Sequence, residues 1–400
     1  MRLYQLTLFL ALVSLALNLV TSGRQREFFY VAIYFSMAGL FVERKNITLR
    51  PFSIALPILL LGILNLVWYF VYEYHSEGVN IYNEYLMSSK KMILGSILIF
   101  YLDRFKKYVS IQSFEKYFLL ASGVGFFLAS FYALWQVYHG IGRVEMGINR
   151  ATVSAYIYSV LSLSFIYSLF LQKKIAAYVL AGALMLFSWG IIILTGTRAA
   201  MGLFLIFSAS LTLYHFRKFH IKPAIIFLCS TAMLFAVSYS SYIKPKIDQT
   251  VAEVNNFQQG KDNTSLGARF SMWAVGLENG IAHPLGQSME SREQWTGKYI
   301  KNHPDFSSSM TYINVHLHNE FIERFSLQGI FGMVLSIFVF ASLLQQAYIQ
   351  KNTTLLLSSS SLLLYGMTDV ILLSSEALVF FIIIFALSTV FYRNNAITKQ

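Results

Sequence analysis

The sequence predicts an all-α polytopic membrane protein with about twelve transmembrane helices and one large, partly helical loop on the outer side between helices nine and ten. Apolar residues make up 56% of the 400 residues and charged residues only 12%. Apolar runs of roughly 15–23 residues, long enough to cross ~30 Å of hydrocarbon, recur along the chain. Such a chain has too little polar surface for a water-facing globule, which excludes a soluble enzyme, a disordered protein and a nucleic-acid-binding protein.

The predicted spans follow from these apolar runs in order. They lie at about 3–21, 28–42, 51–71, 87–102, 117–138, 152–171, 175–195, 199–216, 224–242, 326–349, 354–373 and 377–392. The first is interpreted as an uncleaved helix, because it lacks a small-residue cleavage site and further spans follow. The predicted organisation is therefore helices one to nine in 1–242, a polar loop at 243–325, and helices ten to twelve with a short tail in 326–400.

Basic residues predict the orientation of the spans. With the N-terminus in the cytoplasm, the inside segments hold 16 Lys and Arg residues and the short outside loops hold seven. Cytoplasmic segments are enriched in Lys and Arg, so both termini are expected inside and the long loop outside. This bias accounts for much of the net charge of +12. The only cysteine, Cys229, lies in an apolar run and forms no disulfide framework or thiolate metal site.

Several catalytic motifs are absent from the sequence. There is no G-x-x-x-x-G-K-[ST] phosphate loop, which argues against ATP hydrolysis. There is also no H-E-x-x-H motif and no Asp-x-Asp pair of the kind that commonly holds the metal of a nucleotide-sugar glycosyltransferase. Any sugar donor is therefore not expected to be a cytoplasmic nucleotide sugar.

Two arginines on the outer side are candidate functional residues. Arg198 lies in the short connection "ILTGTRAAMG", and Arg269 lies in "NTSLGARFSMWAVGLE" within the long loop. Apolar residues at helical spacing follow Arg269, which predicts an amphipathic helix with Ser265 as its N-cap. From the residues alone, a snorkelling Arg198 and a solvated Arg269 remain alternatives.

A histidine-containing segment precedes span ten. It reads "YINVHLHNEFIERF" and contains His316, His318, Asn319 and Glu320. Two histidines at i, i+2 do not share a helical face, and no further ligand follows at metal spacing, which disfavours a zinc site. Asn319 is also a candidate helix cap, and Glu320 an acid favoured by the helix dipole.

Asp369 lies near the outer end of span eleven, in "LLLYGMTDVILLSS". An acidic side chain is costly in the membrane and is a functional candidate for that reason. The alternative is a structural partner for an arginine at a helix end.

The stretch from His318 to Gly332 reads H-N, nine residues, G, two residues, G. It resembles the signature of the O-antigen ligase and polymerase superfamily, H-[NSQ]-x9-G-x2-[GTY]. Gly329 and Gly332 are the two glycines of this match, and their spacing also predicts close helix packing. Arg198 in "TGTRA" and Arg269 in "SLGARFSMW" resemble the family's two functional arginines. The stretches "TSLGAR", "NVHLHNE" and "TDVI" most resemble those of the enterobacterial-type O-antigen ligases.

The resemblance implies a function. Such ligases transfer O-antigen from undecaprenyl diphosphate to a sugar of the lipid A core, at the periplasmic face of the bacterial inner membrane, without ATP, metal or another cofactor. The implied partners are therefore the lipid-linked donor, the lipid A-core oligosaccharide and membrane lipids, with no nucleic acid.

Displacing a diphosphate from an anomeric carbon needs a base for the acceptor hydroxyl and cationic groups for the leaving diphosphate. His318 is the expected base, since imidazole titrates near neutral pH. Arg198 and Arg269 are expected to bind the diphosphate, since guanidinium binds phosphate oxygens bidentately. A single displacement would invert the anomeric configuration. Further candidates for substrate binding are His316, Asn319, Glu320, Arg143, Arg150 and Asp369.

Two other functions compete with this interpretation. An O-antigen polymerase of the same superfamily would use the same donor but extend another undecaprenyl-linked chain. A polysaccharide transporter would instead show charged residues at mid-span and helices broken by Gly or Pro in matching halves. The sequence holds six prolines, mostly near span ends or in loops, and its polar residues gather on one face.

Overall fold

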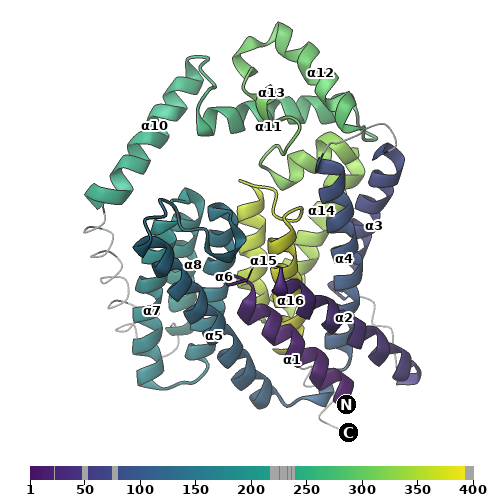
Figure 1. Ribbon diagram of the computed structural model, residues 1–400, viewed down its shortest axis with the longest axis vertical. Helices are drawn as coiled ribbons and strands as arrows, with labels where there is room; N and C mark the ends of the chain where they lie inside the picture. The colour runs from purple at the N-terminus through teal and green to yellow at the C-terminus, as the bar shows by residue number, and fades with distance from the viewer. Residues whose placement is uncertain are drawn as a thin grey trace.

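The computed structural model describes residues 1–21, 23–46, 53–73, 80–216 and 239–391, together with the single positions 225, 232 and 236. Throughout these residues the chain is mainly helical and contains no β-strand (Figure 1). The predicted all-α class is therefore confirmed for the described part of the chain.

Seven of the described helices are long and apolar enough to cross a membrane. They are α3 (Ala55–Tyr72), α4 (Asn80–Arg104), α5 (Ile111–Tyr138), α6 (Ala151–Phe170), α7 (Ile175–Leu194), α8 (Arg198–Phe216) and α14 (Glu320–Ile349). Four others occupy predicted spans: α1 (Arg2–Leu17), α2 (Arg24–Val42), α15 (Thr353–Gly366) and α16 (Ser375–Phe391). The predicted ninth span, 224–242, lies almost wholly outside the described residues, so a total of twelve spans stays a prediction.

Helix α6 forms the centre of the bundle. It packs against α5, α7, α8 and α15, and nearly all its side chains are buried. A helix that is apolar on all sides is expected in such a position. Several of its serines are satisfied within the helix: for example, the hydroxyls of Ser162 and Ser164 donate to the carbonyls four residues earlier. Ser358 and Ser359 of α15 do the same, as expected for hydroxyls inside a span.

The predicted loop 243–325 contains further helices. They are α10 (Lys244–Gln258), α11 (Ser265–Ala282), α12 (Met289–Asn302) and the short α13 (Ser309–Tyr312). Figure 1 shows them together at one end of the bundle, with α11 and α12 above α14. The predicted amphipathic helix is present as α11. Its N-cap is Thr264 and not Ser265, because the Thr264 hydroxyl accepts a hydrogen bond from the N–H of Gly267.

A second apolar core joins these outer helices to the bundle. It combines side chains from α3 and α4 with others from α11, α12, α14 and the segments at 313–317 and 370–373. Its buried members are Trp68, Ile81, Tyr82, Tyr85, Ala268, Met272, Met289, Ile313, Leu317, Leu327, Val370 and Leu373. This core fixes α11 against the start of α14, where the candidate site lies.

One of the two glycines in the α14 signature, Gly329, breaks the helix in addition to allowing close packing. Gly329 adopts φ 62° and ψ −154°, which interrupts the helix. A Cβ at this position would overlap the carbonyl oxygen of Pro284, and that same oxygen accepts a hydrogen bond from the N–H of Ile330 at 2.9 Å. Only glycine tolerates this positive φ without strain. The break therefore lets the connection between α11 and α12 lie directly against α14.

Candidate functional site

His318 and Asp369 form a hydrogen-bonded pair beside the first turn of α14. Nδ1 of His318 lies 3.1 Å from Oδ1 of Asp369. Asp369 belongs to a non-helical segment, 367–374, so the predicted eleventh span, 354–373, is wrong at its end: α15 stops at Gly366. The side chains of His318 and Asp369 are 29% and 17% exposed, respectively. The imidazole is therefore accessible to a substrate while its Nδ1 is hydrogen-bonded to Asp369.

The backbone of His318 is held in an unusual conformation. Its φ is 50°, in the left-handed region that non-glycine residues seldom adopt. Neighbouring contacts hold the segment in place. The indole N–H of Trp273 donates to the carbonyl of His318 at 3.3 Å, and the side-chain amide of Asn319 donates to the carbonyl of Met367 at 3.0 Å. Such strain is typical of functional sites.

Arg269 lies on α11 one helical turn before Trp273, and therefore on the face of α11 that meets His318. Its side chain is half-buried, and no described residue forms a hydrogen bond or ion pair with it. Its charge acts on both Asp369 and Tyr156. A guanidinium with free donors thus lies near the histidine–aspartate pair.

The protonation of Asp369 follows from its surroundings. Burial raises the pKa of this carboxyl, but the hydrogen bond with His318, the backbone N–H of Val370 and the charge of Arg269 together hold the pKa below its ordinary value. An ionised carboxylate only accepts hydrogen bonds. Nδ1 of a neutral His318 therefore carries the hydrogen, and Nε2 carries the lone pair that can accept a proton.

Arg198 begins α8 and is already paired in the structure. Its guanidinium lies 3.2 Å from Glu253 of α10 and donates to the hydroxyl of Thr250 at 2.7 Å. Glu253 also accepts from the backbone N–H of Leu266, in the first turn of α11, at 3.2 Å. The structure therefore connects Arg198 to the helix that carries Arg269 through one carboxylate.

The other two arginine candidates lie on the connection between α5 and α6. Arg143 is exposed and donates through Nε to the carbonyl of Thr195 at 2.9 Å, which places it beside the turn that leads to Arg198. Arg150 is exposed at the N-terminal end of α6, and no described residue forms a hydrogen bond with its side chain. Arg143 thus contacts the turn that precedes Arg198, whereas no contact with a described residue connects the Arg150 side chain to this turn.

Three of the predicted substrate-binding residues form hydrogen bonds or ion pairs with other residues of the protein. His316 is buried and its Nε2 lies 2.7 Å from Glu84 of α4. Asn319 caps α14 by accepting from the N–H groups of Phe321 and Ile322. Glu320 is fully buried and bonds to Arg324 at 2.7 Å. These contacts give the three residues positioning roles around His318 and leave Glu320 out of reach of a substrate.

The sequence interpretation did not identify two buried arginines below His318. Arg292 of α12 lies 3.1 Å from Glu323, whose carboxylate also accepts from the N–H of Leu317. Arg324 pairs with Glu320 within α14. The i, i+4 spacing of the Glu320–Arg324 pair is a signal in the sequence, but the Arg292–Glu323 pair joins residues 31 positions apart and has none.

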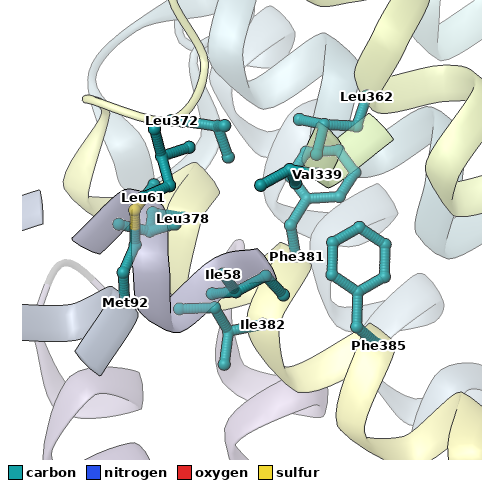
Figure 2. Close-up of a pocket in the computed structure, with 10 residues that line it drawn as sticks. All are labelled: Ile58, Leu61, Met92, Val339, Leu362, Leu372, Leu378, Phe381, Ile382 and Phe385. Carbon is teal, nitrogen blue, oxygen red and sulfur yellow. The ribbon is translucent and has the colours of Figure 1, made fainter. Parts of the chain in front are cut away.

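No group of metal-ligating side chains accompanies these residues in the described part of the chain. There, no three His, Cys, Asp or Glu side chains gather closely enough to hold a metal ion. A small cavity lies between α3, α4, α14, α15 and α16 (Figure 2). All of its lining side chains are apolar, among them Met92, Val339 and Phe381. It therefore offers no contact to a charged donor.

Comparison with known proteins supports the resemblance seen in the sequence. A family model described as O-antigen ligase matches residues 183–337, which include Arg198, Arg269 and His318. An O-antigen ligase of Escherichia coli (strain K12) is 28% identical to this chain, and the alignment covers 76% of this chain and 73% of that protein. The family match ends before Asp369 and begins after Arg143 and Arg150, so it does not include these three residues.

Proposed function

Since the chain is related to the O-antigen ligases, we propose that it transfers O-antigen polysaccharide from undecaprenyl diphosphate to the lipid A-core oligosaccharide. The reaction takes place at the periplasmic face of the inner membrane. The observation that carries this proposal is the His318–Asp369 pair with the unpaired guanidinium of Arg269 beside it.

In the proposed reaction, Nε2 of His318 takes the proton of the acceptor hydroxyl. The hydroxyl oxygen then forms a bond to the anomeric carbon of the donor sugar, and the bond from that carbon to the phosphate oxygen breaks. Undecaprenyl diphosphate leaves with the bonding electrons. Asp369 orients the imidazole and stabilises the imidazolium that forms. One displacement inverts the anomeric configuration.

Arg269 stabilises the leaving diphosphate. Its free donors can form two parallel hydrogen bonds to phosphate oxygens, and these bonds strengthen as negative charge develops there. Arg198 can contribute only by exchanging Glu253 for phosphate, since the carboxylate already occupies its guanidinium. In this proposal Arg198 and Arg143 bind the diphosphate on its approach, and donor binding releases Glu253.

The test is transfer in vitro with purified donor, acceptor and full-length protein. His318→Ala is expected to lower turnover by about 10²–10⁴-fold, the range of a general base. Arg269→Ala is expected to remove most transfer, and Arg269→Lys to restore only part of it, because lysine lacks the planar fork. Lys298→Ala, at an exposed position of α12, is the matched control. Near-normal turnover of His318→Ala would refute the proposed base.

The role of Arg198 needs a second variant. If Arg198 binds diphosphate, Glu253→Gln removes the negative charge that competes with phosphate for its guanidinium, so transfer is retained or increased, whereas Arg198→Ala loses transfer. If Arg198 only connects α8 to α10 and α11, the two variants lose activity together. Equal loss would thus restrict the diphosphate site to Arg269.

A deletion strain separates the ligase from a polymerase of the same superfamily. Loss of a ligase leaves lipid A-core without O-antigen, and the polymer accumulates on undecaprenyl diphosphate. Loss of a polymerase leaves core that carries single repeats. A lipopolysaccharide gel distinguishes the two patterns, and single repeats would contradict the ligase proposal.

A further inference from the structure

A second group of charged side chains lies outside the proposed catalytic site, where α2, α4 and α16 pack together. Its centre is Lys91 of α4, whose side chain is 1% exposed. The charges close enough to act on its ammonium group are those of Arg26 on α2, Lys90 on α4 and Glu376 on α16. We call Arg26, Lys90, Lys91 and Glu376 the α2–α4–α16 cluster.

The cluster holds three cations and one carboxylate, so its positive charge is not balanced. The one hydrogen bond described for the Lys91 ammonium runs to the carbonyl of Met87, one turn earlier in the same helix, and is long at 3.4 Å. Arg26 donates to the hydroxyl of Ser375, also at 3.4 Å. No described carboxylate lies within ion-pair distance of either residue. Uncompensated charge in such a setting is costly and points to an anion that completes it.

The three cations of the cluster differ in their exposure to the surroundings. Lys91 is buried, Arg26 is half-buried and Lys90 is exposed. Snorkelling to headgroups accounts for an exposed cation such as Lys90, but it does not account for a buried one. An anion at the surface of this helix group can therefore contact Lys90 first and reach the other two cations from there.

We propose that Arg26, Lys90 and Lys91 bind a lipid-borne phosphate group at the membrane interface. A phosphomonoester carries a charge of about −1.5 to −2 near neutral pH, which balances the excess of positive charge in the cluster. Basic pockets between membrane helices bind anionic lipid headgroups by this same chemistry. The ligand class is an anionic phosphorylated lipid. A glycolipid with a phosphomonoester, such as lipid A, balances the excess fully, whereas the phosphodiester of an anionic glycerophospholipid carries one negative charge and balances it in part.

The α2–α4–α16 cluster is linked by hydrogen bonds to the region around the non-helical segment 367–374, which contains Asp369. The hydroxyl of Ser88, one turn before Lys91 on α4, donates to the carbonyl of Leu372 at 2.8 Å. Arg26 contacts Ser375, the first residue of α16, directly after this segment. If the proposed ligase function holds, a lipid A phosphate bound here belongs to the acceptor, and its core sugars extend toward His318. This assignment to the acceptor rests on the proposed function, whereas binding of a phosphorylated lipid does not.

The experiment measures lipid binding by the full-length protein in detergent by native mass spectrometry, with lipid A, phosphatidylglycerol, phosphatidylcholine and inorganic phosphate as separate probes. Lys90→Gln is the mild variant, since the side chain is exposed, and Arg26→Gln/Lys90→Gln/Lys91→Gln is the full one. Each lost cation is expected to weaken binding of a phosphorylated lipid about fivefold. The control with the same charge change is Lys45→Gln/Lys116→Gln/Lys174→Gln, at three exposed positions, and should bind normally.

A clear preference for lipid A over phosphatidylglycerol supports the acceptor assignment, and equal binding of the two supports a general site for phosphorylated lipids. Unchanged binding in Lys90→Gln, equal losses in the control, or inorganic phosphate binding as well as lipid would overturn the proposal. The same measurement on His318→Ala keeps the two proposals apart. Lipid binding is expected to persist there even though transfer is lost.

Discussion

At the scale of single residues, the pairing of His318 with Asp369 makes a direct prediction. In Asp369→Asn, the side-chain amide can donate to Nδ1, which favours the tautomer with its hydrogen on Nε2 and removes the base. Turnover should fall about 10²-fold or more, with a small change in KM. Steady-state transfer assays measure both. Asp305→Asn, at an exposed acid in the same outer region, is the control, and comparable turnover in both variants would contradict the orienting role.

The pair formed by buried His316 and partly exposed Glu84 predicts a pH dependence of stability. Burial lowers the pKa of His316, but the hydrogen bond to Glu84 and the charges of Glu323 and Asp369 outweigh it, so the pKa lies above its ordinary value of 6.5. A raised pKa stabilises the folded protein at pH below the unfolded value, and this stabilisation is lost as pH rises through the folded value. The thermal unfolding midpoint should therefore fall with rising pH above about 6.5, and Glu84→Gln should flatten that dependence. An identical slope in the variant would assign the dependence to other groups.

At the scale of elements, the break in α14 depends on one glycine. Gly329→Ala forces a Cβ against Pro284 while the backbone must keep φ 62°. We expect a loss of at least about 2 kcal/mol in stability. Thermal unfolding in detergent tests this expectation. Gly182→Ala in α7 meets no neighbouring atom and should be neutral or stabilising. Equal stability of the two variants would show that the break is not required.

The helices also show what local sequence patterns can predict. Apolar runs identified most spans, because length and hydropathy are local properties. The end of the eleventh span was wrong because residues 370–373 are apolar but not helical. Their backbone is held by α14, where Glu320 accepts from the N–H of Leu372 at 3.0 Å. Hydropathy cannot detect a hydrogen bond between residues 52 positions apart.

In the candidate site, too, local motifs were predicted and long-range contacts were not. His318 and Arg269 stand in motifs that the sequence displays, and they lie near each other in the structure. The partners that lie far away in the sequence could not be predicted. Asp369 lies 51 residues from His318, and Glu253 lies 55 residues from Arg198, with no spacing that connects them. Residue types and motifs thus predicted which side chains to consider for the site, whereas their hydrogen bonding depends on the fold.

At the scale of the whole molecule, the site depends on the attachment of the outer helices to the bundle. Helix α10 is attached at Arg198 through Glu253, and α11 and α12 are attached through the second apolar core and the Arg292–Glu323 pair. His318, Asp369 and Arg269 belong to three different segments of this junction. A substrate at the junction therefore meets groups from both the bundle and the outer helices.

This arrangement has one consequence for topology. If α10 to α13 face the periplasm, as the distribution of basic residues predicts, a cysteine at Ser291 of α12 becomes reachable from outside the inner membrane. The native Cys229 is first replaced by serine, so that Ser291→Cys supplies the only thiol. A membrane-impermeant thiol reagent should then label the protein in intact cells with a permeabilised outer membrane.

A cysteine at Lys174, between α6 and α7, should react only after the inner membrane is lysed. The reverse pattern would place His318 in the cytoplasm, away from lipid-linked O-antigen, and would refute the proposed ligase as well as the topology.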